Sequence, residues 1–474
     1  MQQLSGQDAS FLYFETANAP MHIGSFALYD PSTASEPLSY EKIVHNTAQR
    51  LHRARCFRQR VVRVPLDLDH PYWIEDPDFD LEFHVRHIAL PKPGDWQQLC
   101  TQVARLQARP LDLTRPLWEM YVIEGLESIP GLPRGSFALL SKIHHAAIDG
   151  VSGAELAAAI HDLEPDAEVP PPDAPWSPDE VPSARELLLK SLGHRALGPL
   201  KLGRVLMEAV PAAVRARDEQ RKHPVEPVGV PRTRFNGPVS PHRSIGGVDL
   251  DLGAVRAIKK SVPGATVNDA ILTIVGGALR RYLEAKGELP EQALVAMAPI
   301  SARAMGEQGA AGNRVSVMTV GLGSDVADPA ERLRRVHAKA AGSKAFNQAV
   351  GSRLMTDVQE VIPGSLAGLA ARIFTRFGLA NRVDPFFNCV VTNVPGPQFP
   401  LYSAGARLVA NYGLGPIQDG LGLIHPIFSY CGRITIAFTA CRAMLPDPRF
   451  YEDCLRASFE DLRTATLGPS QEAR

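Results

Sequence analysis

The sequence is poor in several features that would narrow its class at once. It has six cysteines in 474 residues, and no two of them form a CxxC pair. A redox pair, a zinc site of that kind and a disulfide framework therefore lose support. The 50 Lys and Arg residues are balanced by 51 Asp and Glu residues, for a net charge of -1. Because a nucleic-acid-binding domain usually carries a basic excess, we expect no nucleic-acid partner.

Long apolar runs and the common catalytic signatures are also missing. The longest strongly apolar run, near residues 270–279, has about ten residues, whereas a membrane span needs about 20. The N-terminus lacks the basic and apolar regions of a signal peptide. No GxSxG, GxxxxGK[ST], GxGxxG or HExxH motif is present. We therefore expect a cytoplasmic protein, in solution or peripheral to a membrane, that uses none of these chemistries.

Proline is abundant, with 40 residues, and it is concentrated in one region. Seven prolines and six acidic residues lie within residues 163–183, and a second proline-rich run spans 224–241. Proline fixes φ and removes a backbone donor, so both runs are typical of extended linkers. Between them, residues 185–223 contain nine basic and four acidic residues, and leucines sufficient for one or two short helices.

This proline-rich region divides the chain. We predict an N-terminal domain over residues 1–163, a linker over 164–241 and a C-terminal domain over 242–474. Each half alternates helical and strand-like patterns, which predicts an α/β protein of two layered domains.

Local spacing predicts several elements. Apolar residues at i, i+3, i+4 and i+7 indicate a helix over residues 96–106, and alternation indicates a strand over 137–144. Residues 152–155 and 266–269 have the spacing of a helix capping box. Further strands are predicted over residues 294–300, 314–320, 387–392, 407–412 and 433–439.

The strongest candidate for a catalytic motif is the segment KIHHAAIDGVSGAEL, residues 142–156. His144 and His145 end the predicted strand, and Asp149 and Gly150 follow. An imidazole titrates near neutrality and can take a proton from a hydroxyl or thiol substrate. Asp149 would fold back beside the histidine and pair with an arginine. No nucleophilic Ser or Cys adjoins the pair, which favours direct transfer over a covalent intermediate.

Two other interpretations stay open on spacing alone, namely a surface turn and half of a metal site. A metal site needs a third and a fourth ligand. The remaining histidines are scattered, and no cysteine or carboxylate cluster supports them. We therefore predict no metal.

The motif HHAAIDG matches the HHxxxDG motif of the CoA-dependent acyltransferase superfamily, which includes chloramphenicol acetyltransferase and peptide-synthetase condensation domains. Nearly the whole chain resembles one branch, the bacterial wax ester synthase/diacylglycerol acyltransferase family. The opening residues, the PLW motif, the FNGPVSPHR segment, the Asn-Asp motif and the TNVPGPQFPLY segment match in order. They include Asp8, Phe11, Glu15, Met21, His22, Gly24, Pro116, Leu117, Trp118, Phe235, Asn268, Asp269 and Thr392.

The resemblance implies two chloramphenicol-acetyltransferase-like domains, each a mixed sheet with helices, and an active-site tunnel at their interface. It implies an acyl-CoA-dependent O-acyltransferase that acts on diacylglycerol, a long-chain alcohol or both. The products would be triacylglycerol and wax ester. Acyl-CoA would be a co-substrate, and no cofactor is expected.

The resemblance also implies roles for single residues. His145 would be the general base, His144 would support it, and Asp149 with Gly150 would hold the local backbone. Arg303 is the candidate partner of Asp149. Asn268 would donate to the developing oxyanion or hold His145; the alternative is an ordinary first-turn residue of a helix capped by Thr266.

Four further residues are expected to support the site. Asp269 follows Asn268 in the motif, and Trp118 would be a core residue before a tunnel wall. Pro395 and Gly396 would shape a turn near the domain interface. Where the family often reads GLGLN, this chain has Ile424 and His425, which places the acceptor preference in question.

A long acyl chain and an insoluble product favour an apolar tunnel and a membrane or lipid-droplet surface. The basic segment 185–223 could contact such a surface, or pack on the first domain as a helix pair. Two alternatives remain: an acyltransferase for another hydroxyl or amine acceptor, and a non-catalytic lipid-binding protein. The motifs leave the choice of acceptor, the acyl chain length and the oligomeric state open.

Overall fold

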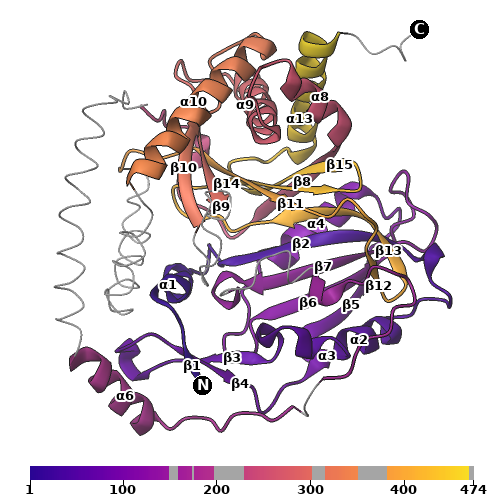
Figure 1. The fold of residues 1–474 in the computed structure, drawn as a ribbon, viewed down its shortest axis with the longest axis vertical. Coiled ribbons are helices and arrows are strands. Elements are labelled where there is room, and N and C mark those ends of the chain that lie inside the picture. The colour runs from indigo at the N-terminus through magenta and orange to yellow at the C-terminus, as the bar shows by residue number, and fades with distance from the viewer. Residues whose placement is uncertain (149–157, 173–175, 197–228, 302–314, 351–381, 469–474) are drawn as a thin grey trace.

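The computed structural model describes residues 1–148, 158–172, 176–196, 229–301, 315–350 and 382–468. Two α/β layers lie one above the other, and each is built on a six-stranded sheet with parallel and antiparallel pairs (Figure 1). The predicted architecture of two mixed-sheet domains is therefore confirmed.

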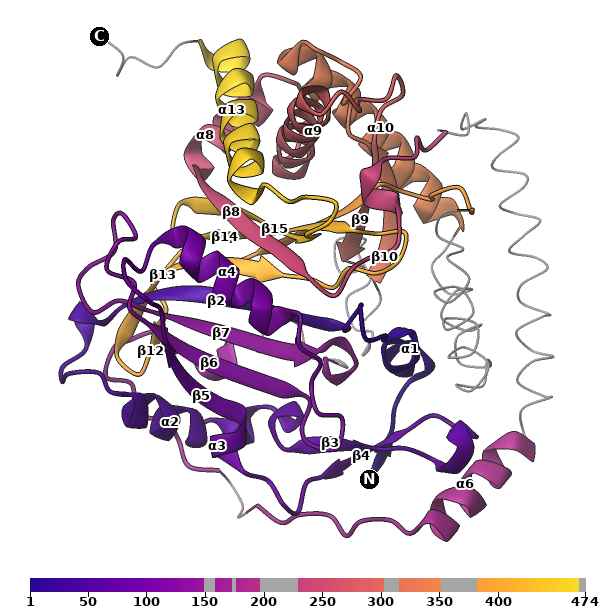
Figure 2. The same cartoon turned by 180° about the vertical axis from the view of Figure 1, so that it is seen from behind.

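The first sheet has the strand order β12-β13-β2-β7-β6-β5. Its strands are β2 (His22–Asp30), β5 (Val85–Ala89), β6 (Trp118–Glu124), β7 (Phe137–His144), β12 (Tyr402–Ser403) and β13 (Ala406–Leu414). Helices α2 (Tyr40–Ala48) and α3 (Leu81–His84) lie on one face, and α4 (Trp96–Gln107) lies on the other, toward the second sheet (Figure 2). A small sheet of β1 (Gln2–Gln3), β4 (Tyr72–Glu75) and β3 (Gln59–Val62) lies near α1 (Gly6–Phe14).

The second sheet has the strand order β10-β9-β11-β14-β15-β8. Its strands are β8 (Arg243–Asp251), β9 (Val295–Ser301), β10 (Val315–Gly321), β11 (Cys389–Pro395), β14 (Leu423–Tyr430) and β15 (Arg433–Cys441). Helices α8 (Leu252–Lys260), α9 (Val267–Ala285), α10 (Pro329–Val350) and α13 (Pro448–Leu467) cover the face that points away from the first sheet (Figure 1). None of the described helices is long and apolar enough to cross a membrane.

The first sheet is not made from one half of the chain alone. Strand β13 follows β11 in sequence, yet it pairs with β2 from Arg407 opposite Asp30 to Leu414 opposite Gly24. This exchange covers an edge of β2 that would otherwise be open to pairing with another chain. The domain limits predicted from the prolines do not capture the exchange, because residues 402–414 lie beyond the linker.

Elements with a strong local pattern occur where the sequence predicts them. Helix α4, strand β7 and helix α9 match the predicted positions, and Thr266 and Asp269 form a capping box before α9. The five further predicted strands match β9, β10, β11, β13 and β15 to within a few residues. Within the two six-stranded sheets, strands β2, β5, β6, β8, β12 and β14 have no counterpart among the predicted strands. The predicted capping box at residues 152–155 lies outside the described residues.

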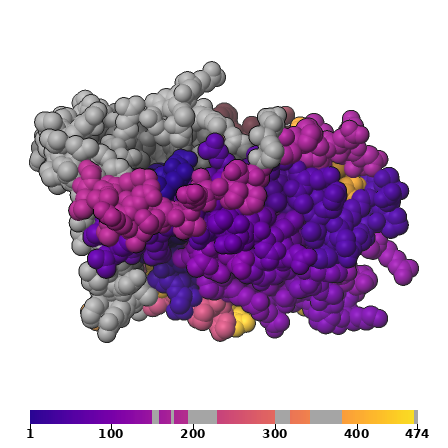
Figure 3. All heavy atoms as spheres, turned by 90° about the horizontal axis from the view of Figure 1, so that it is seen from below, coloured from indigo at the N-terminus to yellow at the C-terminus, as the bar shows by residue number. Residues whose placement is uncertain are grey.

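The described part of the linker contains helix α6 (Ala184–Ala196). Figure 3 shows the segment that includes α6 lying across the surface of the first domain. Leu187 on α6 is buried with Val64 and Tyr72 of that domain, so this part of the linker is packed against it.

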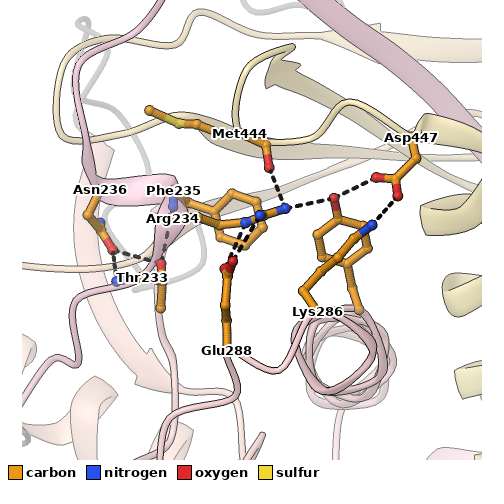
Figure 4. A network of polar contacts seen from close by, with 9 residues as sticks. Thr233, Arg234, Phe235, Asn236, Lys286, Glu288, Met444 and Asp447 are labelled. Atoms are coloured by element: carbon orange, nitrogen blue, oxygen red, sulfur yellow. Dashed lines mark hydrogen bonds and ion pairs between the residues drawn. The ribbon is translucent and has the colours of Figure 1, made fainter.

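The chain enters the second domain through a short 3-10 turn, η6 (Arg234–Asn236), capped by Thr233. Arg234 pairs with Glu288 at 2.8 Å and donates to the hydroxyl of Tyr282 on α9 at 3.2 Å (Figure 4). Asn236 donates to the carbonyl of Phe387 at 2.9 Å. The start of the FNGPVSPHR segment therefore anchors the chain on the second domain.

Candidate active site

The two motif histidines lie where β7 ends beside the start of β2. His144 is the last residue of β7 and faces His22 of β2 in the antiparallel register. His145 begins the 3-10 turn η5 (His145–Ala147), and its backbone N–H donates to the carbonyl of Met21 at 2.8 Å. The backbone of both histidines is therefore fixed by the neighbouring strand.

His144 is fully buried and bonded through both ring nitrogens. Its Nε2 lies 2.8 Å from Oε2 of Glu15, and its Nδ1 accepts from the backbone N–H of Ala146 at 3.1 Å. A backbone amide only donates, so Nδ1 is the acceptor. Nε2 therefore carries the hydrogen and donates a hydrogen bond to Glu15. Glu15 also accepts from the backbone N–H of Met21 at 3.1 Å. His144 has no nitrogen left for a substrate, which fits a supporting role.

His145 has a different environment. Its ring stacks on Phe11 of α1, with the ring centroids 3.7 Å apart and the planes 13° from parallel. Burial, together with a smaller effect of the neighbouring His144, lowers the pKa of His145 to about 4, although a hydrogen bond to the residue's own backbone opposes this shift. The imidazole is therefore neutral at physiological pH, and the neutral ring is the form that accepts a proton.

Helix α1 supplies the wall beside the histidines. Ser5 caps its first turn by accepting from the N–H of Asp8 at 3.1 Å, and the helix packs against η5. Phe11 and Glu15 are four residues apart, so they lie near each other at the end of α1. The family resemblance includes both residues, but the sequence indicates no role for them.

A buried charge pair lies on β7 and β6, and its lysine is two residues before His144. Lys142 Nζ is 3.2 Å from Oε2 of Glu119 and donates to the carbonyls of Leu106 and Arg109 at 3.2 and 2.9 Å. These contacts fasten the end of α4 to β7. Burial, followed by the charge of Lys142, lowers the pKa of His22 well below its usual value, so His22 is also neutral.

Asn268 and Asp269 lie in the first turn of α9. The Asp269 carboxylate accepts from the N–H of Thr266 at 2.8 Å and pairs with Nδ1 of His337 on α10 at 3.0 Å. Asp269 therefore caps α9 and joins it to α10. Asn268 is half-buried, and its role at the oxyanion or in holding His145 stays a prediction.

Asp149, Gly150 and Arg303 lie outside the described residues. Their predicted roles, including the Asp149–Arg303 pair, stay predictions. Among the residues that the structure does describe, no cluster of three or more His, Cys, Asp and Glu side chains fits a metal ion.

Comparison with known proteins decides the family. The catalytic domain of the wax ester synthase/diacylglycerol acyltransferase family matches residues 4–271, and the C-terminal domain of that family matches residues 311–463. This chain belongs to that family. It is an acyltransferase.

Relatives in sequence and in structure cover almost the entire acyltransferase. A Mycobacterium tuberculosis protein provisionally named diacylglycerol O-acyltransferase is 35% identical over 473 residues, which is 98% of both chains. The solved wax ester synthase/diacylglycerol acyltransferase from Marinobacter aquaeolei VT8 is 27% identical, with a TM-score of 0.70 over 98% of both chains. The starter condensation domain of rhizomide synthetase, 14% identical, has a TM-score of 0.55 over 98% of this chain and 94% of its own, and so shares the fold.

Trp118 lies in the core of the acyltransferase, as predicted. Its ring stacks on His84 with the centroids 4.5 Å apart, and its Nε1 donates to the carbonyl of Phe57 at 2.9 Å. Pro395 and Gly396 lie where β11 ends, and their predicted role in shaping a turn near the domain interface stays a prediction. Pro395 is the last residue of β11 and pairs with Ser429, and the Gly396 N–H donates to the Ser429 carbonyl at 2.9 Å. The extended pairing with β14 continues through both residues before the chain turns.

The two residues that depart from the family pattern lie on β14. His425 is fully buried, and its Nε2 is 2.7 Å from the hydroxyl of Tyr451 on α13. Burial lowers the pKa of His425 to about 3, so it is a neutral core residue of the second domain. Ile424 packs close to Gly415, which follows β13. Of the two residues that differ from the family pattern, Ile424 therefore contacts the segment that joins the two sheets.

A cleft of about 370 Å³ opens beside Phe137, Arg134 and Glu124. Phe137 begins β7, whereas His144 ends it. This cleft is therefore at the opposite end of the strand from the histidines, and it is not part of the candidate active site.

Proposed function

We propose that this acyltransferase moves a long-chain acyl group from acyl-CoA to the hydroxyl of diacylglycerol, a fatty alcohol or both, with His145 as general base. The observation that carries the proposal is the pair of environments at the end of β7. Both ring nitrogens of His144 are hydrogen-bonded, to Glu15 and to the N–H of Ala146, whereas the neutral ring of His145 stacks on Phe11. The names of the relatives support the two acceptors.

The reaction needs one residue that can hold a proton. The acceptor hydroxyl gives its proton to His145 while its oxygen attacks the thioester carbonyl. When the tetrahedral intermediate collapses, the C–S bond breaks and the imidazolium returns the proton to the CoA thiolate. A C–O bond replaces a C–S bond, and no oxidant, reductant or metal is consumed.

Release of CoA from palmitoyl-CoA tests this proposal, with hexadecanol and dioleoylglycerol as separate acceptors. We expect His145→Ala to lower the rate by roughly 10²- to 10⁴-fold, the usual contribution of a general base. His45→Ala is the matched control, because His45 is an exposed residue of α2, and it should retain the full rate. Full activity in His145→Ala, or no CoA release with any acceptor, would defeat the assignment.

We infer in addition that the enzyme works at an anionic lipid surface, with α6 as one contact. Leu189 and Leu192 on α6 are 60% and 59% exposed, and Leu66 in the adjacent turn η4 (Pro65–Asp67) is 84% exposed. Apolar side chains of this size beside a basic segment are typical of membrane-surface helices.

Flotation with phosphatidylglycerol vesicles tests the lipid contact. The variant Leu189→Ser/Leu192→Ser should shift from the vesicle fraction to the soluble fraction. Leu467→Ser is the control, since Leu467 is an exposed leucine at the end of α13, far from α6 (Figure 1). Unchanged partition of the α6 variant would reject α6 as the contact.

A further inference from the structure

Arg243, the first residue of β8, reaches from the second domain to the loop that precedes β2. It is 6% exposed. Its Nη2 donates to the carbonyl of Asn18 at 2.6 Å, and its Nη1 donates to the carbonyl of Ser240 at 2.7 Å. One guanidinium group thus joins two segments that are more than 200 residues apart in sequence.

The loop that Arg243 holds is compact. Thr16 and Ala19 exchange two backbone hydrogen bonds of 3.2 and 3.0 Å, so Asn18 lies in a tight turn. Ala19 and Met21 are both buried in the hydrophobic cluster of the second domain, among residues of α9 and β14. By packing, therefore, this loop of the first domain belongs to the second.

Met21 connects the loop to both histidines. Its carbonyl accepts from the N–H of His145, and its N–H donates to Glu15, which in turn binds His144. A displacement of the loop would therefore move the backbone of His145 and the partner of His144 together.

Arg243 holds this position without a carboxylate partner among the described residues. Burial lowers the pKa of Arg243 to about 10, so the group remains charged at neutral pH. A buried cation that is satisfied by backbone carbonyls adds little to stability in comparison with an apolar residue of similar size. The planar guanidinium of Arg243 donates to two carbonyls at once, and this geometry is suited to holding a loop in one position.

We propose that Arg243 is a positioning residue for acyl transfer, which ties the Asn18 loop to the second domain and so fixes His145 against Phe11. The proposal rests on the general-base role of His145. It couples the docking of the two domains to the orientation of the reacting ring.

Steady-state kinetics with palmitoyl-CoA and hexadecanol test the proposal in the full-length enzyme. Arg243→Met should lower kcat about 10- to 100-fold, since a misplacement of about 1 Å can lower a rate 100-fold, and it should leave KM for palmitoyl-CoA nearly unchanged. Arg243→Lys should restore part of kcat, because lysine keeps a donor for one of the two carbonyls. If Arg243→Met does not fold, the same split between kcat and KM is measured in Arg243→Lys.

Tyr412→Phe is the matched control. The hydroxyl of Tyr412 on β13 donates to Oδ2 of Asp249 on β8 at 2.7 Å, so the variant removes another contact between the first sheet and the same strand. It should lower the melting temperature and leave kcat unchanged. If Arg243→Met also leaves kcat unchanged, Arg243 is only structural and the proposal is overturned.

A double variant tests whether Arg243 acts through the loop. Phe11→Ala and Arg243→Met should combine to less than the product of their separate effects on kcat, because both release the same ring. A multiplicative result would overturn the proposal. Full activity of His145→Ala would instead remove the general-base function itself, so the two failures are distinguishable.

Discussion

At the scale of single residues, two adjacent histidines differ because their surroundings differ. His144 has both nitrogens occupied, by Glu15 and by the N–H of Ala146. His145 has the ring of Phe11 stacked on its own. Burial of the ring, to which Phe11 contributes, excludes water and disfavours the charged imidazolium, and this burial is the main cause of the lowered pKa of His145.

Removal of the Phe11 ring should move the acid limit of activity. In Phe11→Ala, water reaches the ring, so the pKa of His145 should rise from about 4 toward the ordinary value of about 6.5. A protonated ring cannot accept a proton, so the acid limb of kcat/KM should shift to higher pH. Phe11→Leu keeps an apolar cover and should shift it less. Identical pH profiles for Phe11→Ala and the unchanged enzyme would contradict this account.

At the scale of elements, helix α9 packs closely on its neighbours because two of its residues, Gly276 and Gly277, have no side chain. A Cβ at Gly276 would lie 2.1 Å from the carbonyl oxygen of Leu322, and one at Gly277 would lie 2.3 Å from Oγ of Ser458. The paired glycines therefore let α9 approach the backbone after β10 and the helix α13. Gly342 on α10, in contrast, has open space around its Cα.

These two environments predict opposite effects of the same substitution. Gly276→Ala should lower the free energy of unfolding by about 1–3 kcal/mol, because the added methyl group overlaps a backbone carbonyl. Gly342→Ala should raise it by about 0.4–1 kcal/mol, because alanine loses less backbone entropy in a helix. Thermal unfolding of both variants checks this. A stabilised Gly276→Ala would show that α9 can move away from Leu322.

At the scale of the whole molecule, the two domains are joined by a row of buried polar contacts along β8. Arg243 binds the Asn18 carbonyl at one end, and Asp249 binds Tyr412 near the other. Between them, Oε1 of Glu452 accepts from Nε1 of Trp96 on α4 at 2.8 Å and from the N–H of Gly247 at 3.0 Å. Together with the exchanged strand β13, these contacts make the domains one unit.

Buried neutral histidines make this unit sensitive to acid. The pKa of His425 is lowered to about 3 in the folded chain, whereas in the unfolded chain it is about 6.5. Between these values the unfolded state binds a proton that the folded state does not, so stability falls as the pH falls below about 6.5. The same sign holds for His22, His84 and His145.

The variant His425→Gln isolates one of these groups. Glutamine can still bond to the hydroxyl of Tyr451 but does not titrate. The melting temperature of the variant should be below that of the unchanged enzyme at pH 8, and the difference should narrow as the pH falls toward 5. A difference that is constant with pH would show that His425 does not contribute to acid sensitivity.

The sequence by itself determined what depends on near neighbours in the chain. The capping box at Thr266, the helical spacing of α4 and the alternation of β7 are local patterns, and each specifies its element. Strand β14 escaped prediction because Pro426 and His425 interrupt its pattern, and its burial comes from neighbours on both sides. The HHxxxDG motif and the family resemblance likewise indicated the acyltransferase class before any contact was known.

Only the tertiary structure decided which distant residues serve the site. Glu15 meets His144 across 129 residues, and Arg243 meets the Asn18 loop across 225. Strand β13 joins the first sheet although it follows the linker. No local pattern encodes such contacts, because they depend on how two sheets pack and which strand edges they leave to be covered. The prolines mark where the chain passes between the domains, and the packing determines how each domain completes the other.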